Sequence, residues 1–338
     1  MFFCQRIKKG SVSCHVCHYV PQEFVKLNSK GHYMKQDTHI GVHLIACITV
    51  IIWGTTFVWT KLLIAAGISP AQIFTLRFVI AYVLMLGFSL ISRRGGVGHR
   101  WFASLWRDEF RMLLLGITGG SVYFLAENEA LRFTTASNVS LIVCSCPLFT
   151  MLIHRICYRS TPLRLSQIGG SMVAFLGMAV VVLNGHFVLH LSPVGDVLAF
   201  VACLSWACYS LLMKDLSLRY PALFITRKVF FYGLLTVLPY YLLVPGWPSW
   251  SVLMRPDVAC NLLFLGCVAS MLCFLIWNWC IRRLGAVRAT NWVYLNPLAT
   301  VASASLVLGE SITPYFVIGS ILILVGLIWS EKSSPKES

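Results

Sequence analysis

The chain contains 338 residues, of which 58% are hydrophobic and only 12% are charged. A soluble protein must face water with more polar surface than this, so the composition excludes most soluble enzymes and indicates a polytopic membrane protein. The net charge of +15 fits either a nucleic-acid-binding face or basic loops on one side of a membrane, and the position of each charge decides between them.

Ten apolar segments follow one another along the chain. Each is close to the ~20 residues that a helix needs to cross the hydrocarbon core of a bilayer. Alternating segments of ~10 residues, which are typical of membrane β-barrels, do not occur in the sequence. We therefore predict an all-α integral membrane protein with helices at 42–66, 70–92, 110–131, 135–157, 166–184, 194–213, 223–244, 258–281, 285–308 and 314–330.

The basic residues divide unequally between the two sides that these ten spans define. Of the 27 Lys and Arg residues, 23 lie in loops or ends on one side, and only Arg132 and Arg255 lie on the other. Lys61 and Arg77 fall inside spans. The positive-inside rule then places both termini in the cytoplasm. We expect the protein to lie in the plasma (inner) membrane, surrounded by lipid. The charge reports orientation, and no nucleic-acid partner is expected.

The ends of the chain differ in composition from the spans. Residues 1–41 are predicted to be a cytoplasmic extension and 331–338 a cytoplasmic tail. We interpret residues 1–33 as either a disordered segment or an extension of the gene model, with Met34 as the start. The run Cys14-His15-Val16-Cys17-His18 matches a haem-attachment pattern, but the charge places it in the cytoplasm, and we expect no metal and no cofactor.

The two halves of the chain resemble each other in sequence. When residues 124–150 are shifted by 150 positions, nine of 27 residues are identical. The identical pairs include Phe124 and Phe274, Asn128 and Asn278, Val143 and Val293, and Pro147 and Pro297. We therefore divide the chain into repeats at 42–190 and 191–330, each with five spans. An odd number of spans makes the two repeats inverted in the membrane, an architecture typical of secondary transporters.

Several short motifs occur in the order found in one family. The first repeat contains Trp53-Gly54-x-x-Phe57, Arg77-Phe78 and Ala130-Leu131-Arg132. The second contains Asn296-Pro297-Leu298 and Leu308-Gly309-Glu310. In this order they resemble the drug/metabolite transporter (DMT) superfamily and its EamA-type ten-helix exporters. The first repeat has Arg159-Ser160 in place of the Gly-Glu element, so that acidic position is lost.

The resemblance implies a transporter, not an enzyme. Members of the family export or exchange small metabolites, often amino acids, through a central cavity and without ATP. We expect alternating access and a small-molecule substrate, an amino acid or an amphipathic solute or drug, with no obligate protein partner. A membrane enzyme acting on lipids and a channel or flippase-like conduit remain the alternatives. The loops hold no cluster of His, Asp and Glu for the former, and the sequence has no P-loop.

Aromatic residues recur within the predicted spans and suit an amphipathic organic substrate. The alternative for each is helix packing or an interface belt. Trp53, Trp206 and Trp277 are the preferred lining residues because they lie near the middle of their spans. The full set of aromatic candidates for the substrate cavity is Trp53, Phe57, Tyr123, Trp206, Tyr209, Trp277 and Tyr294.

Charged side chains inside spans are rare and mark either function or anchoring. Lys61 and Lys214 are repeat-related candidates for gating, with snorkelling to the interface as the alternative. Arg77 is deeper and is expected to pair with a carboxylate or carbonyl.

The outer half of the third span carries a second set of polar candidates. Glu127 is predicted to face the cavity with Tyr123 one turn away, and Glu129 points about 200° from it. Glu127 suits proton-coupled antiport, and its alternative role is as a partner of Arg77 or Arg132. Asn278, repeated from Asn128, is a further candidate for the cavity or a gate.

Two prolines occupy matching positions in the fourth and ninth spans. Pro147 and Pro297 each free a backbone carbonyl four residues earlier. Matched helix breaks in two halves are a pointer to a transport site, and simple kinks for packing are the alternative.

Overall fold

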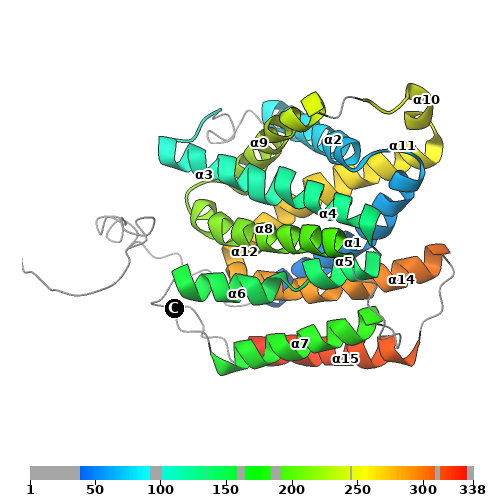
Figure 1. Cartoon of the computed structure of the whole chain (residues 1–338). Helices are drawn as coiled ribbons and strands as arrows, with labels where there is room; N and C mark the ends of the chain where they lie inside the picture. The colour runs from blue at the N-terminus through cyan, green and yellow to red at the C-terminus, as the bar shows by residue number, and fades with distance from the viewer. Residues whose placement is uncertain are drawn as a thin grey trace, which may run out of the picture. The chain divides into compact units, whose positions relative to one another are not determined.

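The computed structural model describes residues 39–91, 101–134, 136–157, 164–183, 192–243, 246–308 and 313–332. The predicted N-terminal extension up to Thr38, with its C-x-x-C-H run, lies outside this part of the chain, as do Arg159-Ser160 and Gly309-Glu310. All regular secondary structure in the described ranges is helical (Figure 1). The all-α prediction is therefore confirmed for these residues.

The first half of the chain forms seven α-helices and one π-helical segment in the described ranges. Most of these helices coincide with apolar segments of the sequence. Pro70 occupies the first position of α2, where proline is best tolerated. The elements are α1 (His39–Ala65), α2 (Pro70–Ile91), α3 (Trp106–Gly116), η3 (Ile117–Ser121), α4 (Val122–Phe133), α5 (Ala136–Val143), α6 (Cys146–Cys157) and α7 (Leu165–Leu183).

The second half repeats this order in the described ranges with two additional short helices, α10 and the 3-10 helix η5. Ser192 caps the first helix by accepting from the Gly195 amide, and Pro193 occupies its first turn. The elements are α8 (Pro193–Ser217), α9 (Ala222–Leu243), α10 (Trp250–Leu253), α11 (Pro256–Leu263), η4 (Phe264–Leu272), α12 (Cys273–Leu284), α13 (Ala286–Asn291), η5 (Trp292–Leu295), α14 (Asn296–Leu308) and α15 (Pro314–Lys332).

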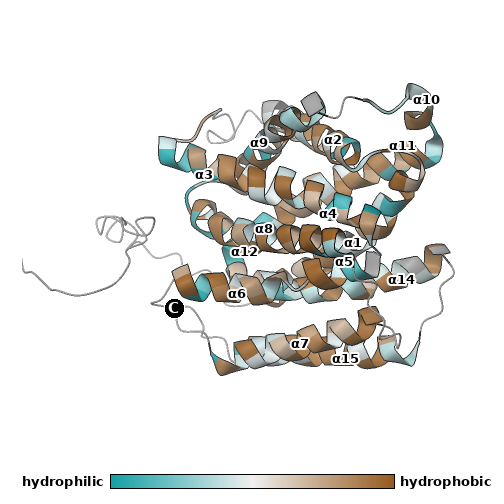
Figure 2. Ribbon diagram, viewed as in Figure 1, coloured by the Kyte–Doolittle hydropathy of each residue, from teal (hydrophilic) through white to brown (hydrophobic). Residues whose placement is uncertain are grey.

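Helical stretches overlap all ten predicted segments, and seven stretches of the described chain are long and apolar enough to cross a membrane. Figure 2 shows hydrophobic residues over most of the helical surface. Many large apolar side chains face outward, such as Val83, Leu176 and Ile321. Such a surface is typical of helices in contact with lipid. The seven stretches are Ile40–Ala65, Pro70–Ser89, Asn138–Cys157, Leu165–Leu183, Pro193–Ser217, Ala222–Tyr241 and Pro256–Leu284.

The other three predicted segments differ from these seven. Segment 110–131 lies on the run α3–η3–α4, and segment 285–308 is divided among α13, η5 and α14. Segment 314–330 lies on α15 and is apolar but shorter, with the apolar part ending at Ser330.

The helices of the two halves pack on one another in reciprocal pairs. Helix α1 packs on α14 of the second half, and α8 packs on α6 of the first. The π-helical segments behave in the same way, because η3 contacts α9 and η4 contacts α2. The same contacts are thus made twice, with the halves exchanged.

Helices α7 and α15 lie side by side, as Figure 1 shows. Glycines on both helices allow the two backbones to touch. A Cβ added at Gly177 would lie 2.7 Å from the Gly319 carbonyl oxygen, and one added at Gly170 would lie 2.6 Å from that of Gly326. Small residues at such crossings stabilise helix pairs in membranes by close van der Waals contact.

Candidate functional site

A small cavity lies between the two halves of the helical bundle. Its volume is about 30 Å³, which is room for one or two water molecules but not for an organic metabolite. Its walls come from α1, α2, α4, α5, α6, α8, α12, η5 and α14. A larger molecule could enter only if these helices moved apart.

Aromatic rings form much of the wall. Trp53 of α1 lies edge-on to Trp206 of α8, with ring centroids 5.3 Å apart. Tyr123 of α4 contacts the other side of Trp206 at 4.9 Å. Phe57 completes the four predicted aromatic residues that line the cavity. The indole Nε1–H of Trp206 is buried and has no hydrogen-bond partner among the described residues, so it is available to a guest.

Two opposite charges reach the same cavity. Arg77 is 2% exposed and Glu127 is 8% exposed, and both line the wall. Arg77 donates its Nε–H to Ser270 Oγ at 2.8 Å, and its Cζ lies 4.5 Å from the centroid of the Phe124 ring. The Tyr123 hydroxyl donates to Glu127 Oε1 at 3.1 Å. The protein thus presents a guanidinium and a carboxylate at one narrow, largely aromatic cavity.

The helix breaks border the cavity. Helix α5 ends at Val143, and α6 begins again at Cys146, just before Pro147. In the second half α13 passes into the short η5, and α14 begins at Asn296, just before Pro297. The residues before each proline and four positions earlier line the wall: Val143, Cys146, Val293 and Asn296.

The two π-helical segments are held by side chains of the opposite half. Trp53 donates its Nε1–H to the Ala269 carbonyl in η4 at 2.8 Å. Ser205 of α8 donates its hydroxyl to the Thr118 carbonyl in η3, also at 2.8 Å. The wide turn of a π-helix leaves carbonyls free for such contacts, and π-bulges are frequent at functional sites. Neither π-helical segment is predicted from the sequence.

Four predicted cavity residues lie behind the wall instead of on it. Trp277 is fully buried with its ring 5.1 Å from that of Trp53. Tyr209 donates its hydroxyl to Asn278 Oδ1 at 2.7 Å, and Asn278 donates to Thr226 at 2.7 Å. Tyr294 is likewise buried outside the cavity lining. These side chains hold the wall in place.

The two repeat-related lysines also lie away from the cavity lining. Lys61 is exposed on α1, and Lys214 is half-buried near the end of α8. Arg132, the second alternative partner for Glu127, binds Glu129 instead, with Nη1 and Oε2 3.0 Å apart.

Seven lining residues were not among the sequence candidates. The repeat comparison held the signal for two pairs, because Phe124 and Phe274 are repeat-related identities and so are Val143 and Val293. Repeat-related residues meet wherever two halves face each other across an axis. The seven residues are Thr56, Phe124, Val143, Cys146, Phe274, Val293 and Asn296.

A helical bundle with lipid-facing apolar surfaces and a charged, aromatic cavity between two similar halves defines a multi-pass membrane transporter. The sequence profile described as the EamA-like transporter family matches residues 40–183 and 193–330. The chain therefore belongs to the EamA-like transporter family, and the resemblance drawn from the motifs is confirmed.

Relatives of known name agree with this assignment. The chain is 25% identical over 290 residues to an uncharacterised transporter of Archaeoglobus fulgidus, covering 84% of this chain and 95% of the relative. It is 27% identical over 305 residues to a "probable amino-acid metabolite efflux pump" of Salmonella typhimurium, covering 84% and 92%. A solved crystal structure with 17% identity shares the fold, with a TM-score of 0.69 over 88% of this chain and 98% of the other.

Proposed function

We propose that this protein is a secondary transporter that exports or exchanges a small organic metabolite by alternating access. The cavity carries the proposal, because it lies between the halves and is lined by repeat-related residues such as Phe124 and Phe274. Its lining includes the side chains of Arg77 and Glu127, which can carry opposite charges, but its present volume is too small for a metabolite. A cavity this narrow has to widen toward one side of the membrane or the other before it can bind and release a metabolite.

The proposed arrangement is ten spans in two inverted five-helix repeats, 42–190 and 191–330, in the plasma membrane. The reciprocal packing of α1 on α14 and of α8 on α6 supports two repeats related by a pseudo-two-fold axis, and the odd number of spans proposed for each repeat makes them inverted. The concentration of 23 of the 27 Lys and Arg residues on one predicted side supports two cytoplasmic termini.

The proposed substrate is an amino acid or a related amphipathic solute. Arg77 offers a planar donor group that suits a carboxylate, and Glu127 can accept hydrogen bonds from an ammonium group. The surrounding Trp and Tyr rings suit an apolar side chain. The Salmonella typhimurium relative, named as an amino-acid metabolite efflux pump, supports the same class.

Glu127 is also the proposed coupling group. A carboxyl that is buried beside the substrate site can bind a proton on one side of the membrane and release it on the other. Its occupation by a proton would then alternate with its occupation by a cationic substrate.

Counterflow in proteoliposomes tests the proposal. The purified protein is reconstituted with a high internal concentration of an unlabelled amino acid, and uptake of the labelled amino acid is followed across a panel of apolar and polar side chains. A carrier gives a saturable, transient overshoot for its substrates. Non-saturating flux without overshoot would instead show a channel, and turnover of bilayer lipid would show an enzyme.

A further inference from the structure

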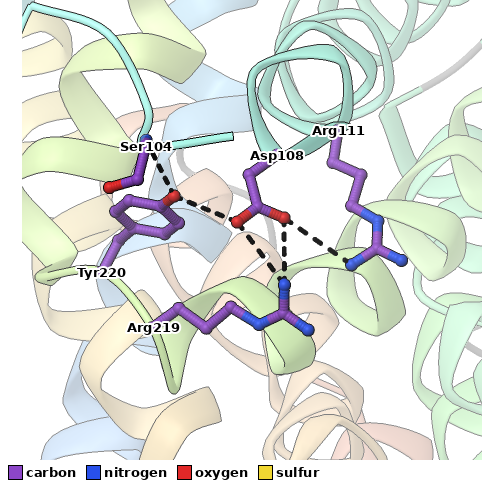
Figure 3. Close-up of polar contacts among 5 residues, drawn as sticks. All are labelled: Ser104, Asp108, Arg111, Arg219 and Tyr220. Carbon is purple, nitrogen blue, oxygen red and sulfur yellow. Dashed lines mark hydrogen bonds and ion pairs between the residues drawn. The ribbon is translucent and has the colours of Figure 1, made fainter. Parts of the chain in front are cut away.

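Asp108 and Glu109 lie side by side at the start of α3, in a chain with only 12 acidic residues. Asp108 is 2% exposed and is bound from several directions (Figure 3). Arg219, just after α8, places Nη1 3.1 Å from Asp108 Oδ1. The Tyr220 hydroxyl donates to Asp108 Oδ2 at 3.0 Å and accepts from the Ser104 amide at 3.1 Å. One carboxylate therefore joins the first half to the α8–α9 connection of the second.

Glu109 makes a second connection of the same kind. Its Oε1 accepts from the ammonium of Lys228 and from the hydroxyl of Tyr232, both on α9. Its Oε2 accepts from the Ala103 amide at 2.6 Å. The Lys228 and Glu109 side chains are 6% and 8% exposed, so this ion pair is closed to solvent.

The segment before α3 is clamped to α9 as well. The Lys228 ammonium lies 4.6 Å from the centroid of the Phe102 ring, and the Arg227 guanidinium lies 5.5 Å from that of Trp101. Cation–π contacts of this length add to the attraction of the ion pairs. Residues 101–109 of the first half thus bind to the second half through both backbone and side-chain contacts.

The repeat-related place at the other end of the bundle is built differently. A shift of 150 residues carries Asp108 to Val258 and Glu109 to Ala259, so both acidic residues are replaced by apolar ones. There, between the end of α1 and the start of α11, lies an open hollow of about 680 Å³, and no ion pair between the halves occurs there among the described residues. The acid–base pair at this end, Arg255 with Asp257, is solvent-exposed and joins two neighbouring residues, not two halves.

We propose that Asp108, Glu109, Arg219, Tyr220, Lys228 and Tyr232 form the inner gate of the transporter. The gate holds the halves together at the end predicted to face the cytoplasm, and its ion pairs must separate before the cavity can open to that side. The tied inner end and the hollow outer end make this structure an inside-closed conformation. The inference rests on the proposed alternating-access function.

A native cysteine provides a direct test of the gate. Cys146 lines the cavity and is fully buried. We expect Asp108→Asn and Glu109→Gln to raise the rate at which a charged, membrane-impermeant thiol reagent modifies Cys146 in inside-out vesicles. The rise should be about tenfold, the population shift expected from the loss of one charge-assisted, hydrogen-bonded pair. Fragment ions in tandem mass spectrometry separate Cys146 from Cys144, which lies two positions earlier on the same tryptic peptide.

Arg219→Gln is the second variant, because Arg219 is half-exposed and its loss leaves folding largely intact. The matched control is Asp257→Asn, which neutralises an acid–base pair at the opposite end and should leave the Cys146 rate unchanged. Faster modification from the inner side with slower modification in right-side-out vesicles supports a gate. Unchanged rates in folded Asp108→Asn and Arg219→Gln proteins, or equal increases from both sides, would overturn it.

The labelling requires neither substrate nor flux, so its outcome is separate from that of counterflow. A side-specific increase without counterflow in any substrate panel would leave the gate standing and remove the proposed carrier activity. Saturable counterflow with no change in labelling would remove the gate alone.

Discussion

The two halves of the cavity wall carry identical apolar residues but different charged residues. Phe124 and Val143 of the first half face the cavity together with their identical counterparts, Phe274 and Val293. The residue 150 positions after Glu127, in contrast, is Trp277, which is buried behind the wall. Matching apolar residues thus surround a charge that the repeat does not duplicate. Among the described residues that line the cavity, the one carboxylate available to a proton or a cationic group is Glu127 of the first half.

The largest effect is expected from removal of that carboxylate. Glu127→Gln keeps the size of the side chain and can still accept from Tyr123, but it carries no charge. We expect proton-driven flux to fall at least about tenfold, because the amide cannot bind and release a proton and offers no charged acceptor to an ammonium group, an interaction worth ~1.5–3 kcal/mol. Flux driven by an imposed pH gradient in proteoliposomes measures this.

Glu129→Gln is the matched control, since Glu129 lies two residues away and binds Arg132 and Tyr240 outside the cavity lining. If Glu127→Gln keeps full proton-dependent flux, the asymmetric charge has no coupling role. A loss in both variants would point to folding instead.

The cationic partner is expected to have the next largest effect. Arg77→Lys keeps the charge but loses the planar fork that binds Ser270 and stacks on Phe124. We expect the apparent affinity for a carboxylate-bearing substrate to fall about tenfold, with a smaller effect on its decarboxylated amine. Lys61→Gln, on the exposed face of α1, should change neither value, and a large effect there would restore Lys61 as a gating residue.

The packing of α7 on α15, the fifth predicted span of each half, tests a contact to which both halves contribute the same kind of helix. Gly177→Val would place side-chain atoms against Gly319 and Leu322 of α15. Overpacking of this kind costs ~1–3 kcal/mol, so Tm in detergent should fall while substrate selectivity is kept. Gly87→Val is the control, since nothing lies within 4 Å of its added Cβ. A change of selectivity would show that α7 and α15 shape the site.

The smallest effect is expected from substitutions that compare Trp206, which lines the cavity, with Trp277, which lies behind the wall. Trp206→Phe removes the unpaired indole N–H at the cavity and should weaken substrate binding by a few-fold, the value of one neutral hydrogen bond at ~1 kcal/mol. Trp277→Phe should leave affinity unchanged and lower thermal stability. Equal losses of affinity in both variants would contradict the placement of Trp277 behind the wall.

The sequence predicts the helical class, the family and the existence of an internal repeat, because apolar length and repeated identities survive in it directly. It also predicts Trp53, Phe57, Arg77, Tyr123, Glu127 and Trp206, which the structure places around one cavity. It does not predict which face of a span is buried when both faces are apolar, as for Trp277 and Tyr294. In a membrane span, apolar residues do not recur with the helical period of 3.6 residues, because the lipid and the protein core both accept apolar side chains.

The inner cluster was missed for a different reason. Asp108 and Glu109 lie within a stretch that the charge pattern assigns to a basic loop, and their partners Arg219 and Lys228 are more than 100 residues away. The signal in the sequence is the adjacent Asp-Glu pair itself, which is unusual in a chain with only 12 acidic residues.

The π-helical segments η3 and η4 have a mechanical consequence. Each divides the third helix of its half into two short rods joined by a wide turn, and in both halves the turn is held from the opposite half, by Ser205 or by Trp53. Glu127 and the inner-gate residue Asp108 lie on opposite sides of the turn in η3. We expect the rod with Asp108 to pivot while the rod with Glu127 stays docked against α8, so that one helix serves both a moving end and a stationary binding site.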